Sequence, residues 1–341
     1  MRAAIYNPYL DTLGGGERYS LVFAKVLIEV GYDVYVQWKD SEIQKLLEKR
    51  FGIDLSKINF VKDINRGDGY DLCFWVSDGS IPLLRARKNF LHFQVPFKGV
   101  NGKSLLNKMK LIRINKIICN SYFTKRHIDS EYGVQSLVIY PPVDVENIAP
   151  RTKKNLIIFV GRFSQLEQAK NQHLLVDLFK KFYDGGFRDW RMVLAGGVEV
   201  GTDSYFDNLV RRAKSYPIQI IKSPDFKILK NVYGEAKIFW SAVGFGVDEK
   251  RFPRKVEHFG ISVVESMAGG GVPIVYKSGG YKEIVREGET GFLWSSNREI
   301  LKKTQSLIKE AKKLKKMSSN ARDESKAYRY EMFKARVMEI I

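Results

Sequence analysis

The stretch that decides the fold runs from residue 3 to residue 30 and reads AAIYNPYLDTLGGGERYSLVFAKVLIEV. Its first four residues form a strand-length apolar run, and apolar residues recur at helical spacing from residue 17 to residue 30. Between these segments lies the loop Leu13-Gly14-Gly15-Gly16. A strand, a glycine-rich loop and a helix in this order are typical of a Rossmann-like unit, whose loop N–H groups can approach a phosphate.

The glycine loop does not follow the dinucleotide-binding pattern. The spacing after Gly14 places Tyr19 where a third glycine is needed, which disfavours a nicotinamide or flavin enzyme. Taken alone, the three glycines fit a tight turn as well as they fit a ligand loop.

Strand-like apolar runs alternate with helical patterns along the rest of the chain. These runs lie at residues 34–38, 72–76, 90–93, 117–119 and 137–140 in the first half, and at 156–160, 192–195, 218–221, 238–240, 272–276 and 291–294 in the second. Such alternation predicts parallel sheets covered by helices on both faces. Pro141 and Pro142 forbid helix and central strand, so the domain boundary is expected shortly after them. The sequence therefore predicts an α/β fold with two Rossmann-like domains, residues 1–148 and 149–325, followed by a C-terminal helix over residues 326–341.

Composition excludes several classes of protein. The chain has 341 residues, and no apolar run approaches the roughly 20 residues of a membrane span. The N-terminus lacks the pattern of a signal peptide, which predicts a cytoplasmic protein. Cys73 and Cys119 lie in apolar runs, so no disulfide is expected. The four histidines are scattered and no Asp-x-Asp occurs, so the sequence predicts no metal site.

The net charge of +19 fits nucleic acid, an anionic membrane surface or an acidic substrate. Nucleic acid is disfavoured, because the chain carries no recognition motif for it. Residues 298–316 combine eight cations with an apolar stripe, which predicts an amphipathic helix packed on its domain, with a membrane or polyanion contact as the alternative.

A second basic segment lies between residues 95 and 118. It contains no acidic residue, and its apolar residues are interleaved with Lys98, Lys103, Lys108, Lys110, Arg113 and Lys116. The pattern predicts a helix that either packs on the sheet or docks on an anionic membrane surface.

The strongest candidate site motif is residues 257–271. A helix that begins near Gly260 would direct free N–H groups and its positive dipole end at a diphosphate. Glu257 then lies in the preceding loop and Glu265 inside the helix, where both carboxylates can accept hydrogen bonds from sugar hydroxyls. The structural alternative is that Glu257 caps the helix and Glu265 is solvated. Arg162 and Lys170 follow the first strand of the second half and offer charge that neutralises a leaving diphosphate.

These motifs together resemble the family 4 glycosyltransferases of the GT-B fold. The resemblance rests on the Gly14 to Arg18 loop, Val-Gly-Arg-Phe at residues 160–163 with a following Lys-Asn, Glu-His-Phe-Gly-Ile-Ser-Val-Val-Glu at 257–265, and the glycines at 279, 280, 288 and 291. It spans nearly the whole chain, and it is strongest to the α-1,2-mannosyltransferases that extend lipid-linked oligosaccharides.

The resemblance implies a retaining, metal-independent enzyme that needs no further cofactor and works in a cleft between two domains, with the C-terminal helix returning to the first, acceptor-binding domain. It implies that Arg162 and Lys170 bind the diphosphate and that Glu257 binds the sugar hydroxyls. Glu265 would bind the ribose, the backbone of Gly260, Ile261 and Ser262 the phosphates, and His92 the transferred sugar. Gly15 and Gly16 would approach a phosphate, and base contacts are expected near Ser223.

The resemblance also implies the substrates. A hexose, with mannose favoured, moves from GDP-mannose, or from a UDP- or ADP-sugar, to a glycan or lipid-linked acceptor, and the enzyme is expected at the inner face of a membrane. A glucosyltransferase and a sugar-nucleotide epimerase are the alternatives. Two longer loops depart from the family pattern: residues 165–169 make the assignment of Lys170 less secure than that of Arg162, and residues 243–255 are expected to cover the donor.

Overall fold

The computed structural model describes residues 1–12, 14–198 and 201–341, so Leu13 of the glycine loop lies outside the described residues. The chain forms two compact units, one made of Met1–Pro142 with Tyr330–Ile341 and the other of Val143–Arg329. The first unit ends before residue 148, because the Val143 N–H donates to the Tyr328 carbonyl at 2.8 Å and ties this segment to the second unit. The C-terminal segment that belongs to the first unit begins at Tyr330, four residues later than expected.

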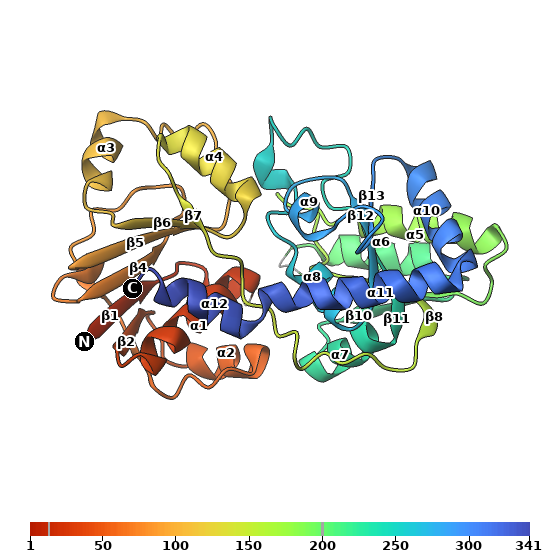
Figure 1. Ribbon diagram of the computed structural model, residues 1–341, viewed down its shortest axis with the longest axis horizontal. Coiled ribbons are helices and arrows are strands. Elements are labelled where there is room, and N and C mark those ends of the chain that lie inside the picture. Colours follow the sequence, from red (N-terminus) through yellow and green to blue (C-terminus); the bar gives the residue numbers. More distant parts are fainter. Residues whose placement is uncertain (13, 199–200) are drawn as a thin grey trace. The chain divides into compact units, whose positions relative to one another are not determined.

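Unit 1 is built on a parallel sheet in the order β3-β2-β1-β4-β5-β6-β7 (Figure 1). Its strands are β1 (Arg2–Tyr6), β2 (Asp33–Gln37), β3 (Ile58–Val61), β4 (Leu72–Val76), β5 (Lys88–Phe93), β6 (Lys116–Cys119) and β7 (Leu137–Val138). The strand pattern of the sequence missed β3, a four-residue strand that pairs only with β2. The strand order reverses between β1 and β4, the place where ligands bind in open α/β sheets.

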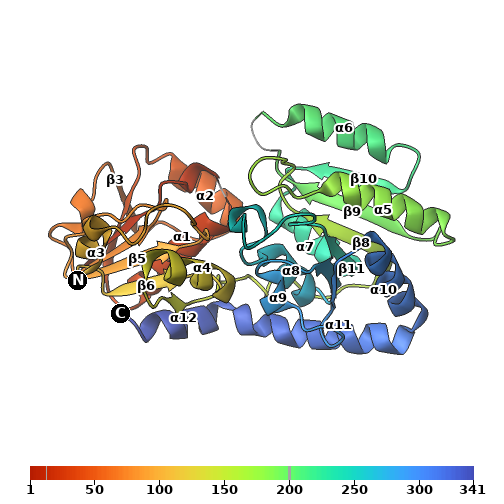
Figure 2. The same ribbon diagram turned by 90° about the horizontal axis from the view of Figure 1, so that it is seen from above.

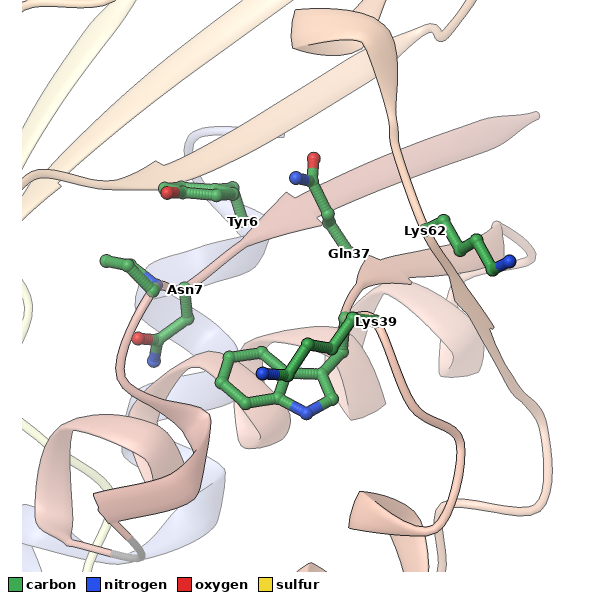
Figure 3. Close-up of a pocket in the computed structure, with 7 residues that line it drawn as sticks. Tyr6, Asn7, Gln37, Lys39 and Lys62 are labelled. Atoms are coloured by element: carbon green, nitrogen blue, oxygen red, sulfur yellow. The ribbon is translucent and has the colours of Figure 1, made fainter.

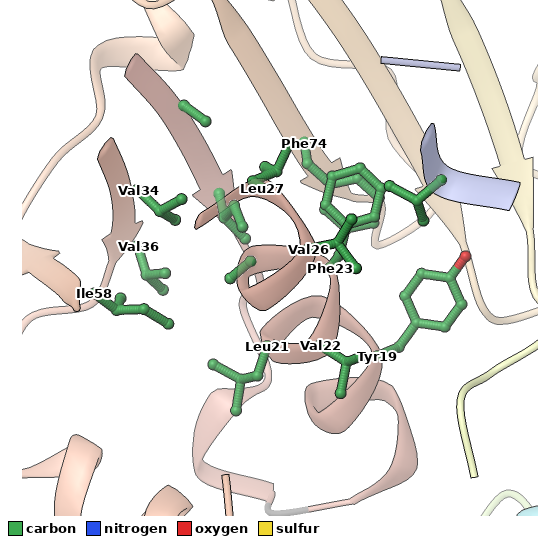
Figure 4. Packing of buried hydrophobic residues seen from close by; sticks show 14 of the residues in the cluster. Tyr19, Leu21, Val22, Phe23, Val26, Leu27, Val34, Val36, Ile58 and Phe74 are labelled. Carbon is green, nitrogen blue, oxygen red and sulfur yellow. The ribbon is translucent and has the colours of Figure 1, made fainter. Parts of the chain in front are cut away.

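The helices of unit 1 are η1 (Leu10–Thr12), α1 (Gly15–Glu29), α2 (Ile43–Phe51), η2 (Asn65–Gly67), α3 (Leu105–Leu111), α4 (Tyr122–Tyr132) and α12 (Tyr330–Met338). Figure 4 shows how α1 packs on the sheet: Phe23 stacks on Phe74 of β4 with 4.1 Å between ring centroids. Phe333 and Val337 of α12 are buried in the same cluster, and each contributes about 1.5–3 kcal/mol by leaving water. This burial attaches the C-terminal helix to unit 1.

Unit 2 holds a six-stranded parallel sheet in the order β10-β9-β8-β11-β12-β13. Its strands are β8 (Lys154–Val160), β9 (Arg191–Gly196), β10 (Ile218–Lys222), β11 (Ala236–Ser241), β12 (Val272–Tyr276) and β13 (Phe292–Trp294). Its helices are α5 (Gln172–Asp184), α6 (Asp203–Ala213), α7 (Phe226–Glu235), η3 (Pro253–Lys255), α8 (Ile261–Ala268), α9 (Tyr281–Ile284), α10 (Asn297–Lys309), α11 (Ala311–Ser325) and η4 (Lys326–Tyr328). Helices α5, α6 and α10 lie on one face of the sheet, and α7, α8 and α11 on the other (Figures 1 and 2).

The basic segment at residues 298–316 forms α10 and the start of α11, with a break at Glu310. Its apolar stripe faces the unit, since Ile300 and Leu307 are buried. Thr304 accepts a hydrogen bond from the Trp240 indole at 3.0 Å. The interpretation as an amphipathic segment packed on its own domain is confirmed by the burial of Ile300 and Leu307. Among the described residues, no helix combines the length and the hydropathy that crossing a bilayer requires.

Candidate active site

The cations and carboxylates predicted from the sequence of unit 2 follow the carboxyl ends of its parallel strands. Arg162 lies two residues after β8, and Glu257 lies near the end of the long loop between β11 and α8. Strands β8 and β11 are neighbours, and the strand order reverses between them. This is the edge where open α/β sheets bind ligands, because the free N–H groups of the following helices point there.

Lys170 and Glu257 form the centre of this site. The Lys170 ammonium lies 3.0 Å from Glu257 Oε2 and 2.6 Å from Gln168 Oε1. The two charged side chains are only 11% and 17% exposed. The longer loop before Lys170 therefore does not displace Lys170 from Glu257. The sequence analysis did not identify Gln168 as a partner of Lys170, because its only signal is its position two residues before Lys170.

Electrostatics hold Glu257 as a carboxylate. Burial alone would raise its pKa, but the charges of Lys170, His258 and Arg162, with the hydrogen bond from Lys170, bring the pKa below the ordinary value. The charge of Arg162 is thus near enough to lower the pKa of Glu257. The backbone carbonyl of Arg162 accepts a hydrogen bond from the Gln172 side-chain amide at 2.7 Å. Glu257 therefore stays negatively charged at neutral pH next to the side chains of Lys170 and Arg162.

Glycines bring the loops around Glu257 close together. Gly260 precedes α8 with a φ of +119°, and a Cβ there would lie 2.8 Å from the Tyr281 ring. A Cβ at Gly279 would lie 2.0 Å from the Glu257 carbonyl, and the Gly280 N–H donates to that carbonyl at 2.8 Å. Glycine is required at Gly260 by the positive φ and the Tyr281 ring, and at Gly279 by the close approach of the Glu257 backbone, which fixes Glu257 beside the start of α8.

Helix α8 carries the remaining predicted groups of the motif. It begins at Ile261, so the amides of Ile261 and Ser262 belong to its first turn, where a helix has no internal partner for its N–H groups. Glu265 lies one turn further, and its Oε2 accepts a hydrogen bond from the Tyr233 hydroxyl at 2.7 Å. This contact shows that Glu265 is oriented by the protein rather than simply solvated.

Two further residues, Tyr281 and Asn171, support the site and were missed from the sequence. The Tyr281 and Ser241 hydroxyls lie 2.8 Å apart in a buried position, and burial with the Glu257 charge raises the pKa of Tyr281. Asn171 adopts a φ of +52° before α5, and its amide donates to the Ala242 carbonyl at 3.0 Å. Neither residue has a sequence signal beyond its place next to a motif.

The two long loops contact each other beside this site. Arg254 forms an ion pair with Glu167 at 2.7 Å, and the Gln168 amide donates to the Val256 carbonyl at 2.6 Å. A pocket of about 370 Å³ lies between the loops and is lined by Gln165, Leu166, Glu167, Ala169, Asn171, Phe245, Val247 and Lys255. The loop at residues 243–255 is thus held by contacts with the loop that precedes Lys170.

Ser223 lies at the same edge of the sheet but further from the centre. It follows β10 with a φ of +49°, and its N–H donates to the Gly196 carbonyl at the end of β9 at 2.7 Å. The side chain is exposed. Strand β10 is two strands away from β8, so Ser223 lies at the outer part of this edge.

The glycine loop of unit 1 has a packing role. The Gly14 N–H donates to Glu17 Oε2 at 2.6 Å, so a carboxylate already occupies the start of α1. A Cβ on Gly16 would lie 1.9 Å from the Gln94 side chain, whereas Gly15 is simply the first residue of the helix. The glycines allow a close approach to Gln94, and the Glu17 charge works against a phosphate at this position.

The structure does not support the expected contact between His92 and a sugar. Side chains alternate along a strand, which places His92 on the Phe90 face of β5, toward α1. The ring is fully buried and stacks on Tyr19 with 4.1 Å between ring centroids. Neither ring nitrogen has a hydrogen-bond partner of normal geometry, and burial lowers the pKa to about 3, although the Ile118 backbone opposes this shift.

His92 should make unit 1 sensitive to acid. The unfolded chain takes up a proton at this residue near pH 6.5, whereas the folded chain does so only near pH 3. Stability is therefore lost as the pH falls below about 6.5, by up to about 1.4 kcal/mol per pH unit. In His92→Phe we expect the urea midpoint to exceed that of the wild type increasingly between pH 7 and pH 5, with activity within about threefold. If the urea midpoints of the wild type and of His92→Phe changed in parallel with pH, the burial of His92 would be contradicted. A large loss of activity in His92→Phe at unchanged stability would support the contact between His92 and the sugar.

Unit 1 has its own pocket at the carboxyl ends of β1, β2 and β3 (Figure 3). Its volume is about 280 Å³, and it is lined by Tyr6, Asn7, Pro8, Gln37, Trp38, Lys39 and Lys62. The Tyr6 ring stacks on Trp75 with 3.8 Å between ring centroids. The pocket offers aromatic surface and two cations, which suits a sugar that carries an anionic group.

Comparisons with known proteins agree with this architecture. The family model "Glycosyl transferases group 1" matches residues 143–324. The chain is 28% identical over 249 residues to the GDP-Man:Man(3)GlcNAc(2)-PP-Dol alpha-1,2-mannosyltransferase of Dictyostelium discoideum, which is 66% of this chain and 46% of that protein. It is 32% identical over 210 residues to the human protein of the same name, 54% of this chain and 39% of that one. The matches thus span less than half the length of these relatives.

Other proteins match along nearly the whole chain. An uncharacterized glycosyltransferase of Methanocaldococcus jannaschii is 23% identical over 352 aligned positions, 96% of this chain and 93% of that protein. The crystal structure of Anabaena HepE in complex with UDP has a TM-score of 0.78 at 16% identity and covers 99% of both chains. A glycosyltransferase of Rickettsia africae has a TM-score of 0.78 at 18% identity, covering 99% of this chain and 97% of its own.

The structural likenesses show a shared fold, two Rossmann-like units of the GT-B type. The family model covers more than half of the chain and nearly all of unit 2, which holds Arg162, Lys170 and Glu257. The chain therefore belongs to the glycosyl transferases group 1 family and has the GT-B fold.

Proposed function

We propose that this chain is a retaining, metal-independent hexosyltransferase that moves mannose from GDP-mannose to a lipid-linked glycan. The observation that carries the proposal is the Lys170–Glu257 pair, which lies beside Arg162 and the start of α8 at the carboxyl edge of the unit 2 sheet. The site combines donors for a diphosphate with a fixed acceptor for sugar hydroxyls. A nucleotide-activated sugar needs both.

Positive charge would stabilise the leaving diphosphate. Arg162 supplies a planar fork for two phosphate oxygens, and the first amides of α8 add N–H donors at the positive end of the helix dipole. Lys170 uses two of its three N–H donors for Gln168 and Glu257, which leaves one for a phosphate oxygen. These groups stabilise the charge that develops as the bond between sugar and phosphate breaks.

The two carboxylates would orient the rest of the donor. Glu257 is held by Lys170 and accepts hydrogen bonds from the sugar hydroxyls, so the anomeric carbon stays next to the diphosphate. Glu265 is held by Tyr233 and accepts hydrogen bonds from the ribose. Ser223, further along the same edge, lies where the base would extend.

The acceptor would bind in unit 1. Its pocket lies at the carboxyl ends of the strands on one side of the β1–β4 reversal. The Tyr6 and Trp38 rings can stack on a sugar face, and Lys39 and Lys62 can pair with an anionic group of a lipid-linked glycan. Mannose and GDP are favoured because the curated relatives that match the chain are named as GDP-mannose-dependent enzymes.

The proposal is tested by measuring the thermal stability of the protein with nucleotide sugars in the absence of metal. With EDTA present, GDP-mannose at 100 times its dissociation constant should stabilise unit 2 by about 2.7 kcal/mol, a rise of roughly 5–10 °C in Tm. UDP-glucose and ADP-glucose should give smaller shifts, and added magnesium should change the shift by less than 1 °C. A shift seen only with magnesium would contradict the charge assignment, and a dominant shift with UDP-glucose would identify a glucosyltransferase.

A further inference from the structure

Helix α3 presents an apolar surface that the protein does not cover. None of its residues is buried. The side chains of Leu105, Leu106, Met109 and Ile112 are 75%, 61%, 59% and 84% exposed. Three of them, at positions 105, 109 and 112, lie on one face of a helix. We call these four residues the α3 apolar patch.

Contacts on the other side of the helix fix this orientation. Leu111 and Ile114 are partly buried and pack against the core cluster that contains Leu91 and Phe93 of β5. The loop before the helix is held by Glu131, whose carboxylate accepts hydrogen bonds from the Gly99, Val100 and Gly102 amides at 3.0–3.2 Å. These hydrogen bonds lower the pKa of Glu131 although burial opposes the shift, so the anchor is charged at neutral pH.

Cations surround the α3 apolar patch. Residues 95–118 carry six positive charges and no negative one. Five of the six side chains are exposed: Lys98, Lys103, Lys108, Arg113 and Lys116. Exposed apolar side chains on a segment that carries six cations and no anion match an anionic bilayer, in which acyl chains lie beneath phosphate groups.

Helix α10 provides an internal comparison. It is as basic as α3, but its Ile300 and Leu307 are buried in unit 2. Cations alone are therefore not distinctive in this chain. The combination of cations with exposed aliphatic side chains is what separates α3 from α10.

We propose that α3 docks the protein on the surface of an anionic membrane. Leu105, Leu106, Met109 and Ile112 enter the headgroup region, and the surrounding lysines and Arg113 pair with lipid phosphates. The proposal concerns unit 1 alone and does not depend on the proposed function, because lipid binding is measured without donor or acceptor.

Vesicle partition of the full chain tests the proposal. Each basic residue near anionic lipid raises affinity about fivefold, so K108Q/R113Q/K116Q should lower the partition coefficient for phosphatidylglycerol vesicles roughly a hundredfold. L105S/M109S/I112S should lower it on the order of a hundredfold, because these side chains leave water on insertion. Wild-type binding should also weaken as sodium chloride rises from 50 to 500 mM.

Matched controls separate the patch from general charge and hydrophobicity. K302Q/K309Q/K312Q removes the same charge from exposed positions of α10 and α11, and Leu46→Ser removes an exposed aliphatic side chain from α2. Both should bind vesicles within about threefold to fivefold of the wild type. All four variants should keep the wild-type Tm within 2–3 °C, since every substituted side chain is exposed.

Two outcomes would overturn the proposal. One is equal binding of the wild type to phosphatidylglycerol and phosphatidylcholine vesicles, or to neither. The other is a dimer in sedimentation experiments that L105S/M109S/I112S converts to a monomer while vesicle binding is unchanged, because the patch would then face a second copy of the chain.

Discussion

Glu257→Gln should lower kcat/KM for glycosyl transfer at least a hundredfold while leaving GDP affinity unchanged or tighter. Glutamine keeps one acceptor oxygen but loses the negative charge that Lys170 and Arg162 now stabilise. A hydrogen bond to a charged group contributes about 1.5–3 kcal/mol, and the loss grows if the bond tightens in the transition state. Removing a negative charge next to a diphosphate has the opposite effect on ground-state binding of GDP.

The matched control for this change is Glu167→Gln. Glu167 is an exposed carboxylate of the neighbouring loop and pairs with Arg254. Its substitution should leave kcat/KM within about threefold of the wild type. Wild-type transfer rates in Glu257→Gln, with unit 2 folded and GDP bound, would show that Glu257 serves the loop structure rather than the sugar.

Arg162→Ala should weaken GDP binding roughly ten- to a hundredfold and lower kcat/KM by at least as much. The guanidinium is expected to bind the diphosphate both in the bound donor and in the transition state. Its removal therefore lowers both the affinity for GDP and the rate of the chemical step. Arg162→Lys should recover only part of the loss, because an ammonium does not supply the planar fork.

Titration calorimetry with GDP measures this effect directly. Arg254→Ala is the control, since it removes an exposed arginine from the neighbouring loop and leaves the β8 edge intact. If Arg162→Ala bound GDP as tightly as Arg254→Ala and the wild type, Arg162 would not be a ligand of the diphosphate.

The sequence predicted the sheets well because most of their strands contain a short run of apolar residues. The run at residues 156–160 was expected as the first strand of the second half, and β8 (Lys154–Val160) contains it. By contrast, β3 (Ile58–Val61) is short and lies at the edge of its sheet, so it gave no recognised apolar run. The edge strand β10 (Ile218–Lys222) is no more buried than β3, but it was predicted because three of its five residues are isoleucine.

The sequence predicted which residues form the candidate site, but it did not predict the contacts between them. Arg162, Lys170 and Glu257 were named from the sequence, but the 3.0 Å contact between Lys170 and Glu257 depends on two loops 87 residues apart. Tyr281 lies against Gly260 and Glu257 only because the backbone after β12 approaches that before α8. Such long-range contacts follow from strand order, which a local pattern does not give.

His92 shows how the expected role of a residue and its environment can differ, since its ring is fully buried. The sequence placed it near a sugar by resemblance, but the alternation of side chains along β5 turns it toward Tyr19. The basic helix α3 shows the opposite case. Its apolar residues occur at spacings that fit either a packed or an exposed face, and only the packing of Leu111 and Ile114 shows which side is left in solvent.

The most direct test of glycosyl transfer at the unit 2 site is the fate of the anomeric carbon. Carbon-13-labelled GDP-mannose is incubated with EDTA, a mannose-terminated lipid-linked acceptor and either the wild type or Glu257→Gln, and the product is followed by NMR. The proposal predicts an α-linked mannose and released GDP with the wild type, and at least a hundredfold slower reaction with the variant. A β-linked product, or equal turnover by both proteins, would contradict it.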